Sequence, residues 1–242
     1  MLKCKKCESE SIVKDGKVRG KQRYLCKECG YNFVEGDART NEKIQAKKAM
    51  CVLQYAQGKA SYNMLAKLYH TWPSLVYRWV KEAGMQIPEP QISENIKEIE
   101  FDEMRHFIGR KKNKLWLIRA VARATRQTIA WVLGRRDVRT FKRLYEKLKH
   151  LKNCIFYTDN WAAFSAVLPA ERHVIGKAHT YIIENNNSNT RHHLGRFTRL
   201  TKVVSKAEHI VDITIRLWVA LPTPFWFNHL QNIALSIYRC PR

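Results

Sequence analysis

The sequence Ile99-Glu100-Phe101-Asp102-Glu103-Met104 begins the segment from which the architecture of this chain can be worked out. Its alternation of apolar and polar side chains is typical of a half-buried strand. Similar patterns make residues 99–108, 115–125 and 128–135 three consecutive strands with short basic turns between them. Strands joined in this way predict an antiparallel meander.

Helices and strands alternate after this meander. Asp137 can cap a helix, and residues 154–158 form a short apolar strand. A helix from Trp161, a strand over residues 173–176 and a helix from about Asn185 follow. The order β-β-β-α-β-α-β-α requires a central sheet with helices packed against it. We therefore expect a multidomain α+β protein whose second half is an α/β core with a mixed sheet.

Two cysteine pairs mark a separate module near the amino terminus. Cys4-Lys5-Lys6-Cys7 and Cys26-Lys27-Glu28-Cys29 have the spacing that closes one tetrahedral zinc site with four thiolates. Such a site has no open coordination position, so the zinc stabilises a fold and does not catalyse. Two disulfides are the alternative, but Met1-Leu2-Lys3 does not begin a secretory signal, which favours metal.

The cysteine module is expected to be a small ribbon. Residues 11–14 and 22–25 are predicted strands, with a basic hairpin over residues 15–21 between them, in which Asp15-Gly16 is the turn signal. So small a module has little core, so zinc binding would supply much of its folding free energy.

From Asn41 the apolar residues recur with a helical period. Gly58 should end a first helix, Ser61 can cap a second, and Pro73 opens a third. The apolar positions expected on the second helix are Met64, Leu65, Leu68 and Tyr69.

Three short helices joined by tight turns predict a helix-turn-helix unit. The last helix of such a unit enters the major groove of DNA with its early exposed residues against the bases. Here those residues are Ser74, Tyr77 and Arg78, with Lys81 near a phosphate. A three-helix packing unit that does not contact DNA is the alternative, and the turn at residues 69–72 lacks the usual small residue.

The chain is strongly basic. Its 242 residues include 44 Lys or Arg and only 21 Asp or Glu, a formal net charge of +23, which indicates a polyanionic partner such as nucleic acid. A membrane surface is the competing partner, but the longest apolar tract, residues 210–227, is interrupted by Asp212, Arg216, Pro222 and Pro224. We expect a cytoplasmic, nucleoid-associated protein that does not use a membrane.

Three acidic residues stand out against this basic background. Asp102 is expected on the strand face opposite Phe101, Asp159 follows the short apolar strand, and Glu184 stands at the start of a helix rich in amides. Clustered carboxylates repel one another unless cations neutralise them, and a pair of Mg²⁺ ions so held supports phosphoryl transfer. Taken singly, the three acids have plainer roles as an exposed strand residue, a turn former and a helix-terminal charge.

The residues around these acids resemble the DDE transposases of the insertion-sequence-one (IS1) family. The resemblance rests on the following residues: Phe101-Asp102-Glu103, Tyr157-Thr158-Asp159-Asn160-Trp161, and then Glu184, Asn187, Asn189, Arg191-His192-His193-Leu194, Arg196, Arg199 and Ser205-Lys206. It covers about residues 1–210, because the cysteine pairs and the three helices are similar to that family's amino-terminal DNA-binding part.

This resemblance implies an RNase H-like core that binds Mg²⁺ or Mn²⁺, cuts the ends of its own mobile element and joins them to target DNA. Asp102, Asp159 and Glu184 would be the metal ligands, and Arg191 and His193 would reach the scissile phosphate or order the cluster. Further basic residues would contact backbone phosphates, although a solvated helix face explains them equally well: Arg196, Arg199, Lys202 and Lys206. Cutting two ends in one complex favours a homo-oligomer on double-stranded DNA.

The predicted domains are a zinc ribbon (1–36), a helix-turn-helix domain (41–84), a linker (85–98) and a catalytic domain (99–242). The tail departs from the family pattern after Lys206, since residues 217–227 contain two prolines and several aromatic residues. Two other functions stay open. One is a non-catalytic DNA-binding regulator, a transposition repressor from a degenerate element copy; the other is a structure-specific nuclease that cuts without joining.

Overall fold

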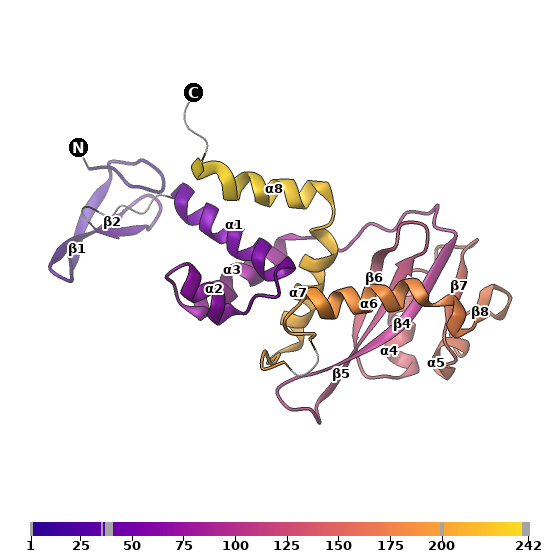
Figure 1. Ribbon diagram of the computed structural model, residues 1–242. Coiled ribbons are helices and arrows are strands. Elements are labelled where there is room, and N and C mark those ends of the chain that lie inside the picture. The colour runs from indigo at the N-terminus through magenta and orange to yellow at the C-terminus, as the bar shows by residue number, and fades with distance from the viewer. Residues whose placement is uncertain (1, 35, 37–40, 199–200, 239–242) are drawn as a thin grey trace. The chain divides into compact units, whose positions relative to one another are not determined.

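A computed structural model of the protein describes residues 2–34, 36, 41–198 and 201–238 (Figure 1). The chain divides into two compact units, one with residues 1–50 and 230–242 and the other with residues 51–229. Helix α1 (Asn41–Gln57) continues from the first unit into the second, and helix α8 (Pro224–Leu235) returns to the first.

The first unit begins with a small antiparallel sheet. Its three strands are β1 (Ile12–Val18), β2 (Lys21–Cys26) and β3 (Asn32–Val34). The hairpin turn lies at Arg19-Gly20, where both φ angles are positive (50° and 78°), as a two-residue type I′ turn requires. The predicted turn at Asp15-Gly16 is wrong, because β1 continues through these residues as a bulge in which Gly16 has a φ of 71°.

Three helices follow, as predicted. They are α1, α2 (Tyr62–Leu68) and α3 (Pro73–Gln86). The Ser61 hydroxyl caps α2 by accepting a hydrogen bond from the backbone N–H of Met64 at 3.2 Å, and Pro73 is the first residue of α3. Two of the apolar residues predicted to mark this helix, Met64 and Leu68, are not buried. Each is 51% exposed, because α2 is only seven residues long and buries just Leu65 and Ala66.

The second unit contains a five-stranded mixed sheet with the strand order β6-β5-β4-β7-β8. Its strands are β4 (Glu98–Phe107), β5 (Lys114–Ala122), β6 (Gln127–Gly134), β7 (Ile155–Thr158) and β8 (His173–Ile175). The first three form the predicted antiparallel meander, whereas β7 and β8 run parallel to β4. The mixed sheet of the prediction is therefore confirmed.

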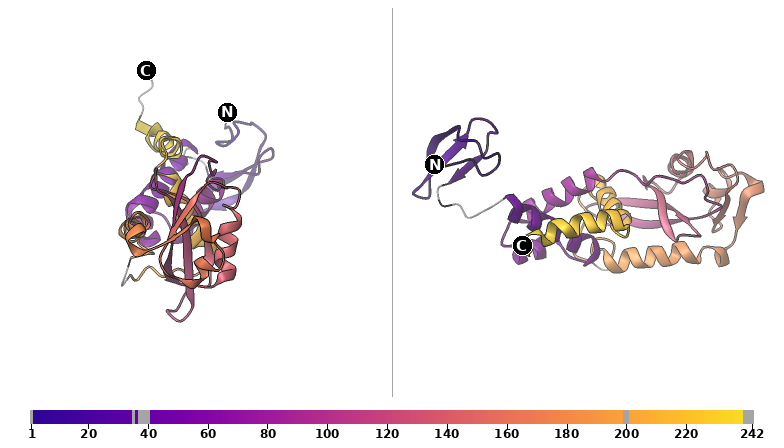
Figure 2. Two further views of the ribbon diagram at one scale, coloured as in Figure 1. Left: turned by 90° about the vertical axis from the view of Figure 1, so that its right-hand side faces the viewer. Right: turned by 90° about the horizontal axis from the view of Figure 1, so that it is seen from above.

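Helices cover both faces of this sheet, and Figure 2 shows α4 and α6 on opposite sides. One face carries α4 (Val138–Glu146) and α5 (Ala162–Ser165), and the other carries α6 (Tyr181–His193) and α7 (Glu208–Ala220). Asp137 caps α4 as predicted, accepting from the Thr140 backbone N–H at 2.8 Å. Helix α6 begins at Tyr181, four residues before the expected start, because Ile182 and Ile183 pack against Val121 of the sheet.

Alternation along β4 divides the core between these faces. Phe101 packs with Phe141 and Phe164 beneath α4 and α5, while Met104 packs with Val211 and Ile215 of α7. Side chains two residues apart on β4 therefore share a face, and those one residue apart do not.

Helix α3 packs closely against α7 in the second unit. A Cβ atom added to Gly84 would lie 2.5 Å from the Cγ2 atom of Ile213, so only glycine permits this approach. The predicted linker that follows is irregular but held in place, since Arg216 donates to the carbonyl of Ile87 at 3.0 Å and Lys147 pairs with Glu89 at 2.6 Å.

Among the described residues, no single helix is long and apolar enough to cross a membrane. Helices α7 and α8 together would meet the length and composition requirement, but the chain bends by 98° between them.

Candidate active site

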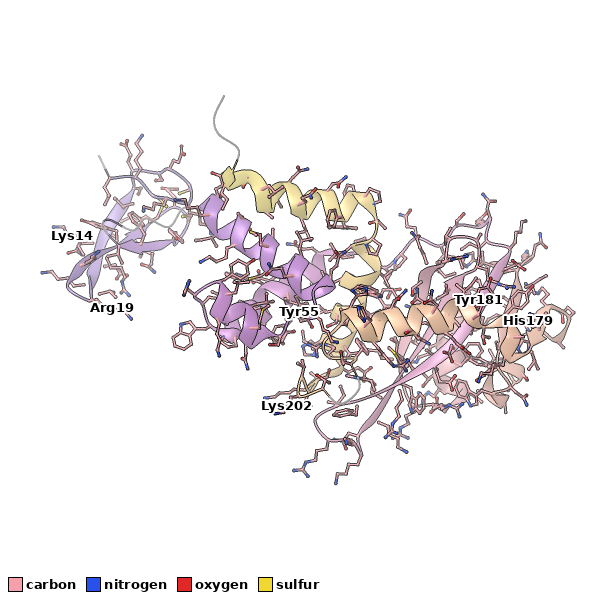
Figure 3. The ribbon with its side chains drawn as sticks, in the orientation of Figure 1. Lys14, Arg19, Tyr55, His179, Tyr181 and Lys202 are labelled. Carbon is pink, nitrogen blue, oxygen red and sulfur yellow. The ribbon has the colours of Figure 1, made fainter. Side chains whose placement is uncertain are left out.

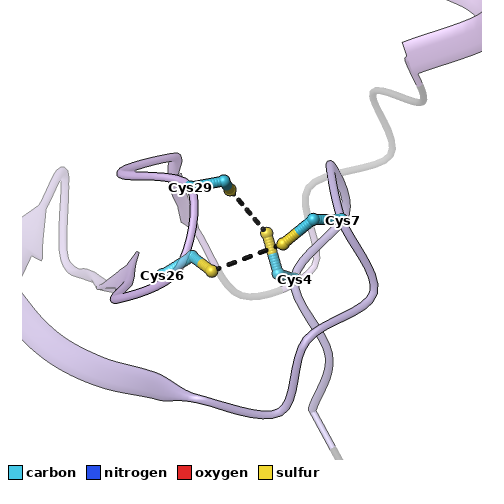
Figure 4. Close-up of side chains that lie close together, drawn as sticks. All are labelled: Cys4, Cys7, Cys26 and Cys29. Carbon is cyan, nitrogen blue, oxygen red and sulfur yellow. Dashed lines mark hydrogen bonds between the residues drawn. The ribbon is translucent and has the colours of Figure 1, made fainter.

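Four cysteine sulfurs converge in the first unit (Figure 4). The sulfurs of Cys4, Cys7, Cys26 and Cys29 all lie within 4.8 Å of one another, and the Cys4–Cys29 and Cys7–Cys26 distances are both 3.6 Å. A disulfide requires about 2.05 Å. Four sulfurs arranged tetrahedrally at about 2.3 Å from one zinc ion would be about 3.8 Å apart. The geometry therefore fits a four-thiolate metal site.

The local backbone favours the ionised form of one of these thiols. Burial opposes ionisation of Cys4, but the backbone N–H groups of Lys6 and Cys7 and the neighbouring thiols lower its pKa to about 6. The lowered pKa of Cys4 favours the thiolate, which is the form of cysteine that binds metal.

A second cluster of potential metal ligands lies in the five-stranded sheet. Carboxylate oxygens of Asp102, Glu103 and Asp159 all lie within 4.8 Å of one another. The first two residues belong to β4, and Asp159 directly follows β7. Because β7 pairs with β4 only over residues 98–100 of β4, the chain leaves the sheet beside the unpaired part of β4, which contains Asp102 and Glu103. This early end of β7 brings Asp159 beside the two acids of β4.

The carboxylate of Asp102 is oriented from two directions. Its Oδ1 accepts from the backbone N–H of Glu103 at 2.8 Å, and its Oδ2 accepts from the side-chain amide of Asn187 on α6 at 2.6 Å. Burial raises the pKa of Asp102, and the Asp159 charge raises it further, while these hydrogen bonds oppose the shift. Asp102 therefore faces α6, on the side of the strand opposite Phe101, as predicted.

A fully buried arginine lies beside Asp102. Arg119 is the partner of Asp102 in the β4–β5 register and donates to Thr190 Oγ1 at 2.9 Å and to the amide oxygen of Asn187. Because the amide oxygen of Asn187 faces Arg119, its NH₂ group faces Asp102 and can donate to the carboxylate. Burial lowers the pKa of Arg119 to about 9, although the Asp102 charge opposes the shift.

Glu103 was not among the predicted site residues. Its Oε1 accepts from Nε and NH2 of Arg136 at 2.7 and 2.6 Å, and the Arg136 guanidinium lies over the rings of Trp161 and Trp116. Its Oε2 is buried and has no hydrogen-bond partner among the described residues. Burial raises the pKa of Glu103 to about 7, with Asp102 and Asp159 adding to the shift and Arg136 opposing it. A buried carboxylate oxygen without a donor, next to two other carboxylates, fits a site for a divalent cation.

Strand alternation explains why sequence reasoning missed Glu103. Residues 102 and 103 point to opposite faces of a regular strand, so Glu103 was not expected beside Asp102. At the open edge beyond β7, however, Asp159 approaches from the side and can meet residues of either face. The only signal in the sequence was the adjacency of the two acids.

Glu184 is not part of the group of three acids that approach within 4.8 Å. It is exposed in the first turn of α6 and immediately follows Ile183, whose backbone N–H donates to the buried Glu100 of β4 at 2.8 Å. Glu100 also pairs with Arg123 at 3.1 Å, so this carboxylate ties the first turn of α6 to the sheet. Glu184 lies one helical turn before Asn187, which contacts Asp102.

The two basic residues expected near the scissile phosphate lie at different places on α6. Arg191 is half-buried two turns after Glu184, and its charge lowers the pKa of Arg119. His193 is the last residue of α6, about 13 Å along the helix from Glu184, and its ring stacks on Trp218 of α7 at 5.3 Å. Arg191 therefore acts electrostatically on Arg119, and His193 packs against another helix.

The residues expected to contact backbone phosphates differ in exposure. Lys202 and Lys206 are exposed, whereas Arg196 is 5% exposed and donates to the hydroxyls of Tyr55, Tyr62 and Ser205. Figure 3 labels Lys202 and Tyr55. Arg199 lies outside the described residues.

The residues nominated on α3 also divide into two groups. Ser74 and Arg78 are exposed. Tyr77 and Lys81 are half-buried, and the Tyr77 hydroxyl lies 3.2 Å from Nε2 of His209 on α7.

Comparison with known proteins identifies the class of protein to which this fold and site belong. The family model described as IS1 transposase matches residues 96–223, a range that contains the whole five-stranded sheet and the acidic cluster. This chain belongs to the IS1 transposase family.

Individual relatives agree with this assignment. The insertion element IS1 protein InsB of Shigella flexneri is 34% identical over 116 residues, which cover 48% of this chain and 88% of that protein. The insertion element IS1 1 protein InsB of Escherichia coli (strain K12) is 31% identical over 150 residues, which cover 61% and 90%. A solved structure of the simian T-cell lymphotropic virus intasome in complex with PP2A regulatory subunit B56 gamma matches 69% of this chain and 67% of that chain at 12% identity, but its TM-score of 0.36 is too low to support an argument.

Proposed function

We propose that this transposase binds the ends of its insertion element and cleaves and joins DNA strands at the acidic cluster in an RNase H-like core. The observation that carries the proposal is the approach of three carboxylates within 4.8 Å in a chain with a net charge of +23. Carboxylates gathered in this way require neutralisation beyond that given by Arg136 on Glu103 and Arg119 beside Asp102, and a divalent cation would supply it.

Asp102, Asp159 and Glu103 would hold a divalent ion, Mg²⁺ or Mn²⁺, and Glu184 would supply a further carboxylate from α6. The position of Glu184 supports this role, because Asn187 on the same face of the helix already contacts Asp102. Two bound ions would activate the attacking hydroxyl and stabilise the leaving oxygen of a phosphodiester.

The neighbouring side chains prepare this site. Asn187 holds Asp102 in one orientation, and Arg119 fixes the direction of the Asn187 amide. Arg191 adds a positive charge on the same side of α6, where it would attract the scissile phosphate. Each of these groups is held by the sheet or by α6, so the site needs little rearrangement when DNA binds.

The zinc ribbon (1–36) and the helix-turn-helix unit (41–84) would recognise the ends of the element. A zinc ion held by the four cysteines would stabilise the ribbon, and the exposed Ser74 and Arg78 would face DNA bases from α3 as part of a helix-turn-helix unit. Assembly of two DNA ends would require a homo-oligomer.

The decisive experiment incubates the purified protein with Mg²⁺ and a labelled duplex that carries the terminal repeats of its element. We expect nicking and strand joining by the parent protein and a loss of at least about a hundredfold in Asp159→Asn, with DNA binding retained. Glu184→Gln should lose activity to a similar extent, whereas Glu171→Gln, another exposed glutamate of the second unit, should not.

Each alternative predicts a different result in this assay. Binding without nicking by the parent protein would identify a regulator, and nicking without joining would identify a nuclease. Full activity in Asp159→Asn would contradict the proposed site.

A further inference from the structure

A basic hollow of about 510 Å³ lies further along β4 from the acidic cluster. Its walls include Arg105, Lys111, Arg191 and Arg196, and none of the described residues that line it is acidic. Arg105 and Lys111 are exposed at the rim, on β4 and on the hairpin that follows it. Four cations around one hollow create a site with a strongly positive potential.

Arg196 gives this hollow a charge that cannot move away. Its guanidinium is buried and is held by the hydroxyls of Tyr55, Tyr62 and Ser205, at distances of 2.7 to 3.2 Å. In the described part of the chain it has no carboxylate partner. Burying a cation among neutral groups alone carries a desolvation free energy that is only partly recovered. An anion in the adjoining hollow would offset this free energy.

The distance between the hollow and the acidic cluster indicates which anion the hollow would bind. Arg105 follows Asp102 by three residues on the same strand, which is roughly 10 Å. Successive phosphates of a DNA strand are closely spaced, so a strand that lies across the acidic cluster would bring a phosphate only a few nucleotides away to the hollow. Arg191 relates the hollow to the acidic cluster. It lines the hollow, and its charge also lowers the pKa of Arg119, which lies beside Asp102.

We propose that this hollow binds one backbone phosphate of the DNA strand, a few nucleotides from the phosphate that is cut. The inference rests on the proposed function, in which DNA lies across the acidic cluster. Arg105 and Lys111 would contact the phosphate directly, and Arg196 would act through its fixed charge. Such a contact holds the register of the strand, so that the phosphodiester next to the acids is the one cleaved.

The test measures DNA affinity without divalent metal, so that no cleavage is needed. Single methylphosphonate linkages, which lack the phosphate charge, are placed one at a time along each strand near the element end. For the parent protein we expect one linkage, within a few nucleotides of the cleavage position, to weaken binding roughly tenfold. In Arg105→Gln/Lys111→Gln we expect affinity to fall by a similar factor and the sensitivity to that linkage to disappear.

A matched control is available in the same hairpin. Arg110 and Lys112 are exposed and do not line the hollow, so Arg110→Gln/Lys112→Gln removes the same charge and should keep the sensitivity to that linkage. The slope of log affinity against log salt should decrease by about one more in the hollow variant than in this control. Unchanged melting temperatures of both variants would show that they fold.

The inference is overturned if the hollow variant keeps its sensitivity to the same linkage or binds no more weakly than the control variant. If the parent protein does not nick DNA, the proposed function is contradicted. The phosphate site would still be supported by the affinity measurements, because they are made separately. Normal nicking with no sensitive linkage would leave the proposed function standing and remove the phosphate site.

Discussion

Replacing Glu103 with glutamine should stabilise the metal-free protein at alkaline pH. The Glu103 side chain is only 7% exposed, one of its oxygens has no donor among the described residues, and its pKa is raised to about 7 by burial and by Asp102 and Asp159. A glutamine keeps an acceptor for Arg136 and removes the negative charge, which burial and the charges of Asp102 and Asp159 destabilise. The acidic cluster therefore carries a repulsion that the substitution relieves.

The size of the effect follows from the pKa. A rise from 4.5 to about 7 corresponds to about 3.5 kcal/mol when each pKa unit is worth about 1.4 kcal/mol, and screening at the sheet edge reduces this to roughly 1–3 kcal/mol. The folded state holds the proton more tightly than the unfolded state, so this contribution to stability is complete below about pH 4.5 and is lost as pH rises to about 7. Glu103→Gln should therefore match the parent protein at pH 4 and exceed it at pH 8.

Thermal unfolding of the second unit, followed by tryptophan fluorescence, measures this difference, since Trp116 and Trp161 flank Arg136. Mg²⁺ at pH 8 should raise the melting temperature of the parent protein more than that of Glu103→Gln, because the ion replaces the lost proton as the neutralising partner. Glu171→Gln, at an exposed position, serves as the control. A Glu103→Gln variant that is less stable than the parent protein at pH 8 would refute the reasoning.

Three further variants test the packing around these sites. Asn187→Ala should destabilise the second unit by about 2–4 kcal/mol in denaturant unfolding, because a buried arginine and a carboxylate both lose a partner, whereas Asn185→Ala on the exposed side of the same helix should change it little. Gly84→Ala should cost about 1–3 kcal/mol, since its Cβ would meet Ile213, and the loss should shrink in an Ile213→Ala background; an equal loss in both would argue against the contact. Cys26→Ser should lower the zinc content measured by atomic absorption below one ion per chain and loosen the ribbon, and an unchanged content would exclude the four-cysteine site.

The strands and helices could be predicted because their signals are local. Alternation placed β4, β5 and β6 within about three residues at each end, and Ser61, Pro73 and Asp137 marked helix starts where the structure has them. The turn of the ribbon was missed because Gly16 and Gly20 both have positive φ angles, and the sequence alone does not say which forms the turn and which the bulge.

The acidic site could be predicted only in part, because its assembly depends on where one strand stops. Asp102 and Asp159 were recognisable from their positions on and after apolar strands. Glu103 was not, since its place in the cluster depends on β7 ending after four residues and leaving the edge of β4 open. No local pattern records the length over which two distant strands pair.

The burial of Arg196 could not be predicted from the sequence either. In the sequence it belongs to a basic run that indicates contact with phosphates, yet its hydrogen-bond partner Tyr55 lies 141 residues away and its side chain is buried. Net charge describes the chain as a whole, whereas burial is decided by which helices meet. In the proposed phosphate site, this cation, buried among hydroxyls beside a hollow with three other cations, would act on the phosphate through its electric field and not through direct contact.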